Sequence, residues 1–297
     1  MNIAKLVEML LFEFQHNIRD GIYGYTQRQL AYNSNKIEGS TLTPEQTETL
    51  FETGELVADG IQVYRAKDIE EMRGHFMMFN YMLNTLKEPL SESLIKAFHK
   101  ELKQGVFEDR ANGYAIGDYK KRPNIIGNVT TTSPDQVQQE INELLSWYNS
   151  LSNITLEDIS AFHVKFERIH PFQDGNGRVG RITMFRECLR NCITPFIVQD
   201  VNRSVYITNL QIKDSDECVT AMMSYFESEQ QAYSASAENL LEGSVPSYKQ
   251  RVYTVLRECY GVSDSVKLEL VFSSLPKAAE TSNDVLRYSI ENILKNM

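Results

Sequence analysis

Apolar side chains recur at intervals of three and four residues along most of the chain, the period of a helix that packs by one face. The pattern predicts helices at residues 1–17, 27–38, 69–86, 91–103, 137–148, 155–169 and 177–190. Thr43 and Ser133 each precede a proline and stand three residues before a glutamine, which predicts a helix N-cap at both positions. The chain is therefore predicted to be mainly helical.

Residues 113–132 break the helical pattern. They contain glycines, Pro123 and short β-favouring patches at 125–126 and 129–132. This composition is typical of a small β-hairpin or flap, with an irregular surface loop as the alternative.

A second break, at residues 233–247, is rich in serine, alanine and glycine and indicates a linker. We therefore predict N-terminal helices at 1–90, a central domain at 91–232 and a C-terminal, mainly helical region at 233–297.

The composition is ordinary for a globular protein, with 42% hydrophobic and 24% charged residues. A net charge of -10 does not indicate nucleic-acid binding, but it allows a small local anion site. No apolar run approaches the roughly 18 residues of a membrane span, and the N-terminus lacks a signal-peptide cleavage site. The sequence predicts a cytoplasmic protein with reduced, mostly buried thiols; Cys188 and Cys192, one turn apart, leave a metal pair as the alternative.

The densest chemistry lies at residues 170–181, between two predicted helices. Its Gly-Asn-Gly run allows close backbone approach, and a helix that begins near Gly177 presents free N–H groups to an anion. Arg178 and Arg181 lie at that positive helix end, which is unfavourable by about 0.3–1 kcal/mol each. A bound polyanion such as a phosphate chain resolves the conflict.

Asp174 and His170 add metal and acid–base chemistry to the same segment. Among phosphates, a carboxylate such as Asp174 is suited to hold Mg²⁺, a hard ion that prefers oxygen ligands. His170 can accept a proton from an incoming hydroxyl, with a purely structural histidine as the alternative. We expect Phe172 to anchor the loop in the core and His163 to be a packed histidine.

The segment 170–181 resembles the signature of the Fic family, His-Pro-Phe-x-(Asp/Glu)-Gly-Asn-Gly-Arg-x-x-Arg, at every fixed position. The resemblance covers roughly residues 30–225, because the neighbouring predicted elements follow in the family's order. It implies an all-α fold: a Fic-type helical bundle with a short β-hairpin flap, here followed by a small C-terminal mainly helical region. It also implies a protein adenylyltransferase, which transfers AMP from ATP to a Ser, Thr or Tyr hydroxyl of a target protein and can modify itself.

The resemblance assigns roles to the loop. His170 is implied as the base for the target hydroxyl, and Asp174 as the ligand of a Mg²⁺ ion between the α- and β-phosphates. The implied ATP- and phosphate-binding residues are Asp174, Gly175, Asn176, Gly177, Arg178, Val179, Gly180 and Arg181, with Tyr206 bordering the adenine.

The flap is implied to align the target chain by β-type pairing through Asn124, Ile125, Ile126 and Gly127. The family's usual Gly-x-Tyr-Arg reads Gly-Asp-Tyr-Lys here and ends at Lys120. This departure concerns the flap contacts and not the chemistry.

A second motif, Ser-Asn-Lys-Ile-Glu-Gly, begins at Ser34. Glu38 falls in the last turn of a predicted helix, where a carboxylate opposes the helix dipole, and Gly39 ends that helix. An exposed glutamate is the simple interpretation. The motif resembles the Fic inhibitory motif, (Ser/Thr)-x-x-x-Glu-(Gly/Asn), in the class whose inhibitory helix precedes the core. That implies that Glu38 pairs with Arg181 and denies it the γ-phosphate.

Other functions remain as alternatives. The same fold can carry out de-AMPylation or another phosphoryl or nucleotidyl transfer, and a non-catalytic nucleotide-binding interaction protein is a third hypothesis. A zinc hydrolase is poorly supported, because no HExxH pair occurs. A protein substrate with an exposed hydroxyl is the expected partner, a homodimer is left open, and neither a membrane nor nucleic acid is indicated.

Overall fold

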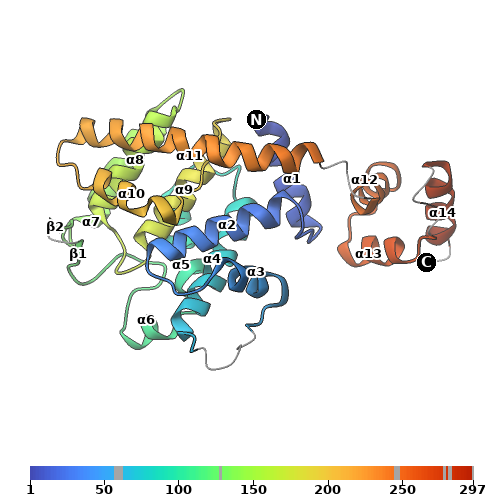
Figure 1. Ribbon diagram of the computed structural model, residues 1–297, viewed down its shortest axis with the longest axis horizontal. Helices are drawn as coiled ribbons and strands as arrows, with labels where there is room; N and C mark the ends of the chain where they lie inside the picture. The colour runs from blue at the N-terminus through green and yellow to red at the C-terminus, as the bar shows by residue number, and fades with distance from the viewer. Residues whose placement is uncertain (57–62, 127–128, 244–247, 277–278, 280–282, 296–297) are drawn as a thin grey trace. The chain divides into compact units, whose positions relative to one another are not determined.

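The computed structural model describes residues 1–56, 63–126, 129–243, 248–276, 279 and 283–295 (Figure 1). The chain divides into two compact units, Met1–Glu238 and Asn239–Met297, which we describe separately. Both units are helical, which confirms the fold class that the apolar pattern predicts. No described helix combines the length and the apolar character of a membrane span.

The larger unit contains α1 (Ile3–Gln15), α2 (Ile22–Ile37), α3 (Pro44–Thr53), α4 (Ala66–Asn84), α5 (Glu92–Lys103), α6 (Phe107–Ala111), β1 (Ile125–Ile126), β2 (Val129–Thr130), α7 (Val137–Ser150), α8 (Leu156–Ile169), α9 (Asn176–Arg190), the 3₁₀ turn η1 (Asp200–Asn202), α10 (Arg203–Leu210) and most of α11 (Ser215–Gly243). The smaller unit continues with α12 (Tyr248–Tyr260), α13 (Ser265–Ser273) and α14 (Asn283–Lys295).

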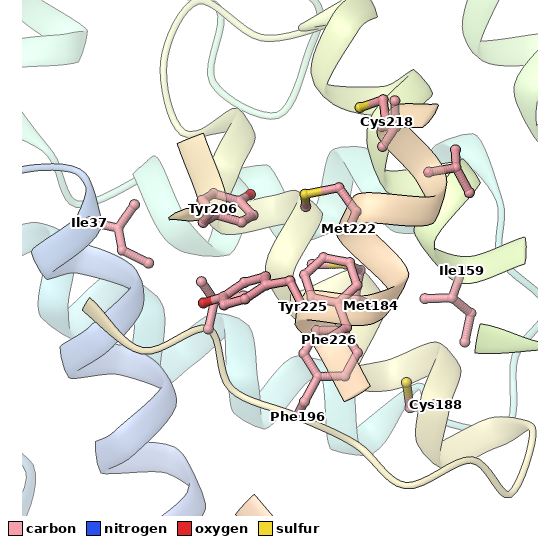
Figure 2. Close-up of a cluster of buried hydrophobic side chains, with 13 residues drawn as sticks. Ile37, Ile159, Met184, Cys188, Phe196, Tyr206, Cys218, Met222, Tyr225 and Phe226 are labelled. Atoms are coloured by element: carbon pink, nitrogen blue, oxygen red, sulfur yellow. The ribbon is translucent and has the colours of Figure 1, made fainter. Parts of the chain in front are cut away.

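The central helix of the larger unit is α9, whose residues 176–189 are all buried. It contacts α2, α4, α5 and α8. Figure 2 shows one side of this core, where Met184 of α9 lies among side chains that include Phe226 of α11. Because α9 is packed against four helices, the C-terminal end of the loop that leads into it has a fixed position in the core.

Polar caps set several helix starts, and the cap predicted at Thr43 is confirmed. Thr43 and Thr155 each form a complete capping box, at the starts of α3 and α8. The cap predicted at Ser133 is wrong, because α7 begins only at Val137. The Ser133 hydroxyl donates to the Gln136 side chain at 2.8 Å instead of accepting a backbone N–H, so the proline segment forms a turn ahead of the helix.

The linker predicted at 233–247 is also wrong over the part that the structure describes. Residues 233–243 continue α11. The serines and alanines there share the helix with Tyr233 and Ala237, which are buried at a spacing of four residues. The Tyr233 hydroxyl also hydrogen-bonds to Thr26 of α2 at 2.8 Å. Tertiary packing therefore decides a segment whose composition alone is typical of a linker.

The four cysteines are free. Cys188 and Cys218 are buried, whereas Cys192 and Cys259 are exposed, so the expectation of buried thiols holds for only two of them.

Candidate active site

The loop between α8 and α9 is closed by its own side chains. His170 ends α8 in the left-handed region, at φ 52° and ψ 62°, and Gly175 precedes α9 at φ 87°. The Asn176 side chain accepts the Phe172 N–H at 2.7 Å and donates to the Phe172 carbonyl at 2.8 Å. The Asn176 amide therefore acts within the loop, which leaves the backbone N–H groups at the start of α9 to face an anion.

Phe172 anchors the loop in the core, as expected, and is 0% exposed. Its ring stacks on His99 of α5 with the centroids 4.0 Å apart. His99 Nδ1 accepts the Gly117 N–H at 2.9 Å, so its Nε2 carries the hydrogen and donates to the Asp174 carbonyl at 3.1 Å. Because burial lowers the pKa of His99 to about 3, this histidine stays neutral and fixes the loop backbone.

Both carboxylate oxygens of Asp174 are oriented by donors. Oδ1 accepts the Gly175 N–H at 2.7 Å and faces Arg178 at 3.3 Å. Oδ2 accepts from Lys103 at 2.8 Å. Burial raises the pKa of Asp174, but the charges of Arg178 and Lys103 outweigh it and hold the pKa well below its usual range. Asp174 is therefore ionised at neutral pH, as a metal ligand must be.

The two arginines of the loop do not extend into solvent. Arg178 Nη1 is 2.8 Å from Glu71 of α4 and 3.2 Å from Asn35 Oδ1 of α2. Arg181 donates to the Ser34 hydroxyl at 2.9 Å and to the Ser34 carbonyl at 3.0 Å. Both guanidinium groups are thus buried against the N-terminal helices.

Glu38 supplies the charge partner of Arg181, as the sequence predicts. Its Oε1 lies 2.6 Å from Arg181 Nη2. Desolvation raises the pKa of Glu38, but the charges of Arg181 and Arg178, together with the hydrogen bond from Arg181, outweigh it and lower the pKa. Gly177 makes room for the contact, because a Cβ there would lie 2.4 Å from Glu38 Oε1. Gly39, at φ 91°, ends the helix just after it.

His170 is partly accessible and neutral. Its side chain is 19% exposed. Burial, reinforced by the charge of Lys120, lowers the pKa of His170 to about 4, so the imidazole can accept a proton at neutral pH. Glu167, one turn earlier, has its Oε2 3.8 Å from His170 Nδ1. Burial raises the pKa of Glu167 to about 8, so this carboxyl is mostly protonated at neutral pH.

A cavity of about 1030 Å³ opens beside the loop, which is ample for a nucleotide. It is lined by Glu38, His170, Gly177 and Arg181, and by Tyr206, Ile207 and Leu210 of α10. The Arg181 guanidinium lies over the Tyr206 ring, 5.8 Å from its centroid. The Tyr206 hydroxyl bonds to His163 Nε2 at 2.7 Å. His163 is 0% exposed, so it is a packed histidine, as expected.

Beside the cavity, β1 and β2 pair antiparallel, with Ile125 opposite Thr130. Asn124 donates to the Phe172 carbonyl at 2.9 Å, and Ile125 is 66% exposed. Gly127, predicted as a flap residue, lies outside the described residues. Lys120, which stands where the family has arginine, bridges Asn124 and Thr131 at 2.7 Å each, so it ties the base of the strands together.

Three residues of the site were missed by sequence reasoning, namely Glu71, Lys103 and Asp109. Glu71 and Asp109 join Asp174 in a group whose carboxylate oxygens lie within 4.8 Å of one another. Carboxylate oxygens suit Mg²⁺, but the Lys103 ammonium already contacts all three. Asp174, with its side chain 33% exposed, is the member that solvent reaches. No local motif marks Glu71 or Asp109, although a lysine on the apolar side of a helix is a signal that was available at Lys103.

Comparison with known proteins finds one family in the central part of the chain. Residues 89–187 match the model of the Fic/DOC family. The chain contains a Fic/DOC domain. The protein adenylyltransferase fic-1 of Caenorhabditis elegans is 25% identical over 185 residues, which cover 61% of this chain and 35% of that protein. The protein adenylyltransferase Fic of Aedes aegypti is 26% identical over 192 residues, or 64% of this chain and 37% of that protein. The chain thus spans well under half the length of these relatives.

Solved structures agree on the fold. A Fic-domain-containing signaling protein from Bacteroides thetaiotaomicron superposes with a TM-score of 0.66 at 22% identity, over 80% of this chain and 97% of that one. Fic-1 of C. elegans gives a TM-score of 0.59 at 21% identity, over 80% and 73% of the two chains. The helical Fic-type fold is therefore confirmed. The Fic/DOC domain holds the loop from His170 to Arg181, while Glu38 lies outside it.

Proposed function

We propose that this chain is an autoinhibited protein adenylyltransferase that transfers AMP from ATP to a hydroxyl of a target protein. One observation carries the proposal: neutral His170 lines the same cavity as Arg181, and Arg181 is held by Glu38 from outside the Fic/DOC domain. The names of the relatives, protein adenylyltransferases, support the same activity.

In the proposed reaction, the target hydroxyl oxygen forms a bond to the α-phosphorus while the bond from that phosphorus to the α–β bridging oxygen breaks. The hydroxyl proton passes to the His170 imidazole, and pyrophosphate leaves. Positioning and charge stabilisation supply most of the rate in such phosphorus transfers. When bound at the Asp174 carboxylate, Mg²⁺ would neutralise negative charge on the α- and β-phosphates.

The remaining loop residues would bind the triphosphate. The first N–H groups of α9, from Asn176 to Arg178, would face the α- and β-phosphates, because helix N-termini bind anions. The N–H groups of Gly175 and Val179 already donate to Asp174 Oδ1 and to the Gly175 carbonyl, so Val179 and Gly180 would shape the first turn of the helix instead. Arg178 and Arg181 would take the β- and γ-phosphates. Tyr206, which also lines the cavity, would border the adenine.

Glu38 inhibits the transfer reaction in this proposal. Arg181 can serve the γ-phosphate only when its ion pair with Glu38 at 2.6 Å is broken. Ser34 helps to hold the arginine away, because both its hydroxyl and its carbonyl accept from the guanidinium. With Arg181 withheld, ATP would bind in a pose unsuited to attack by the hydroxyl.

The flap would align the target. Ile125 is 66% exposed beside the cavity, and Asn124 is tied to the Phe172 carbonyl, so the strand has a fixed base and an accessible edge. An extended target segment would add to Asn124, Ile125 and Ile126 by backbone pairing, continuing to Gly127.

A cytoplasmic location and a homodimer stay predictions.

De-AMPylation is the second candidate, because Glu38 lines the cavity in which the modified hydroxyl would lie. The carboxylate that blocks Arg181 could there assist the attack of water on the AMP ester.

Self-labelling with ATP that carries its label on the α-phosphate tests the proposal. We expect Glu38→Gly to raise labelling above the wild-type level and the added His170→Ala to abolish it. Glu38→Gln, which keeps the shape and removes the charge, is the matched variant and should also raise labelling. Mass spectrometry should find the mass of AMP on the modified protein. A phosphate mass would identify a kinase-like reaction, and no turnover by any variant would favour a non-catalytic nucleotide-binding protein.

A further inference from the structure

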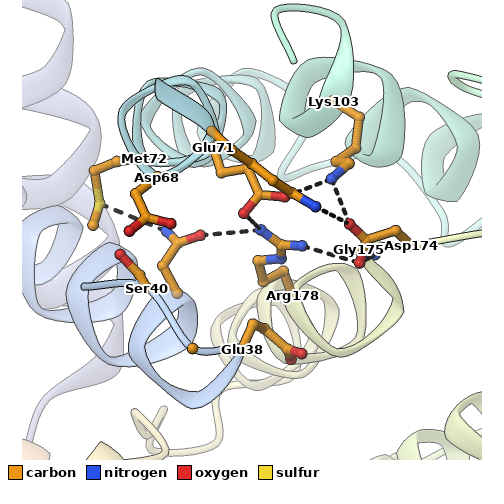
Figure 3. A network of polar contacts seen from close by, with 12 residues as sticks. Glu38, Ser40, Asp68, Glu71, Met72, Lys103, Asp174, Gly175 and Arg178 are labelled. Atoms are coloured by element: carbon orange, nitrogen blue, oxygen red, sulfur yellow. Dashed lines mark hydrogen bonds and ion pairs between the residues drawn. The ribbon is translucent and has the colours of Figure 1, made fainter. Parts of the chain in front are cut away.

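A buried lysine lies next to Asp174, and the proposed transfer chemistry does not use it. Lys103, the last residue of α5, has a side chain that is 1% exposed. Its ammonium contacts Glu71 of α4 at 2.5 Å and Asp174 of the loop at 2.8 Å (Figure 3). It also contacts Asp109 of α6 at 2.5 Å. The ammonium donates hydrogen bonds to Glu71 and Asp174, whereas Asp109 is held by charge alone and its oxygens accept no hydrogen bond from the described residues. The three carboxylates come from separate segments.

Close packing of α4 on α5 places the lysine there. A Cβ on Gly74 of α4 would lie 2.0 Å from the Leu102 carbonyl oxygen, so the two helices approach at a distance that only glycine permits. Gly74 stands one turn after Glu71, and Leu102 precedes Lys103, so this contact sets Glu71 beside the ammonium. A charge this deeply buried persists only when it is paired, and the three carboxylates provide that pairing.

Asp174 belongs to a group of three carboxylates that faces three cations, Lys103, Arg178 and Lys67. Lys67 also lies 3.9 Å from Glu108, at the exposed edge of this group. Arg178 lies 2.8 Å from Glu71 and 3.3 Å from Asp174. Lys67 lies 3.6 Å from Asp174 and 4.0 Å from Asp109. Loss of one carboxylate leaves an excess positive charge beside Asp174, and loss of the lysine charge leaves an excess negative one.

We propose that Lys103 is a positioning residue for Asp174, fixed by Glu71 and Asp109, and that its charge sets the affinity of Asp174 for Mg²⁺. The inference rests on the proposed role of Asp174 in the transfer reaction. The ammonium orients Oδ2 of Asp174, while the Gly175 N–H orients Oδ1. The same ammonium repels a divalent cation, and buried charges are screened only weakly. Asp109 offsets that repulsion, so Lys103 and Asp109 should affect Mg²⁺ binding in opposite directions.

Calorimetric titration of Mg²⁺ into the full chain, saturated with α,β-methylene-ATP, tests the proposal. We expect Lys103→Met to tighten Mg²⁺ binding by about tenfold and Asp109→Asn to weaken it by about tenfold, because each changes one buried charge near the metal ligand. The double variant restores the balance and should bind Mg²⁺ as the wild type does. Lys103→Arg keeps the charge and should stay close to the wild type. Lys96→Met, the same change on α5 at a more exposed ion pair, is the matched control and should have no effect.

A purely structural role predicts a different pattern. Both single variants would then weaken Mg²⁺ binding together with thermal stability, and the double variant would be the weakest binder. That pattern, or affinities equal to that of Lys96→Met, would overturn the proposal. If Lys103→Met does not fold, Asp109→Asn must still weaken binding while Lys103→Arg leaves it unchanged. Failure of the proposed function would be seen separately. Glu38→Gly would then transfer no AMP, while Lys103→Met would still bind Mg²⁺ more tightly than wild type and Asp109→Asn more weakly.

Discussion

Glu167 should make the stability of this protein fall as the pH rises, and Glu167→Gln should remove that dependence. The Glu167 carboxyl lies against the backbone of α9, where a Cβ on Gly180 would be 2.7 Å from Oε1. Burial raises its pKa from 4.5 to about 8, with Glu38 reinforcing the shift and Arg181 partly opposing it. Between those values the unfolded chain releases its proton while the folded chain keeps it, so the free energy of unfolding decreases across this window.

At about 1.4 kcal/mol for each pH unit, the full decrease is about 5 kcal/mol once the pH exceeds 8. Glutamine has nearly the same shape and does not titrate. The unfolding free energy of Glu167→Gln, relative to wild type, should therefore rise between pH 4.5 and about 8 and level off above that pH. Urea denaturation followed by circular dichroism measures it, with Glu157→Gln, at an exposed position of α8, as the control. A difference between Glu167→Gln and wild type that does not change with pH would refute the reasoning.

Two further predictions follow from the loop and its preceding helix. Burial and the charge of Lys120 lower the pKa of His170 to about 4, so His170 stays in its base form down to about that pH. The rate of AMP transfer should therefore stay constant down to the same pH. Lys120→Met should move the inflection of the rate profile upward, whereas an inflection of the wild type near 6.5 would contradict the pKa shift. Thr155→Ala removes the capping box of α8 and should cost about 1 kcal/mol in urea denaturation. An unchanged midpoint would show that the cap does not stabilise α8.

The sequence predicts the parts of this molecule that depend on local signals. The helix periods, the cap at Thr43 and the burial of Phe172 follow from the order of residues along a few turns. The pairing of Glu38 with Arg181 is longer in range, but each residue is unfavourably placed at its own helix end, so the two complement each other.

The rest depends on tertiary contacts that no local pattern encodes. The serine- and alanine-rich end of α11 is helical because Tyr233 is buried against other helices. Lys103 and Glu71 meet only because Gly74 allows α4 and α5 to pack closely. In each case the deciding partner is distant in sequence or has no motif of its own.

The central claim is that Glu38 restrains transfer by holding Arg181. Its most direct test is the initial rate of label transfer from ATP labelled on the α-phosphate, compared among wild type, Glu38→Gly and Glu38→Gly with Arg181→Ala. The account predicts a higher rate for Glu38→Gly than for wild type, and loss of that gain when Arg181 is also removed. Equal rates for wild type and Glu38→Gly, or a gain that survives without Arg181, would contradict it.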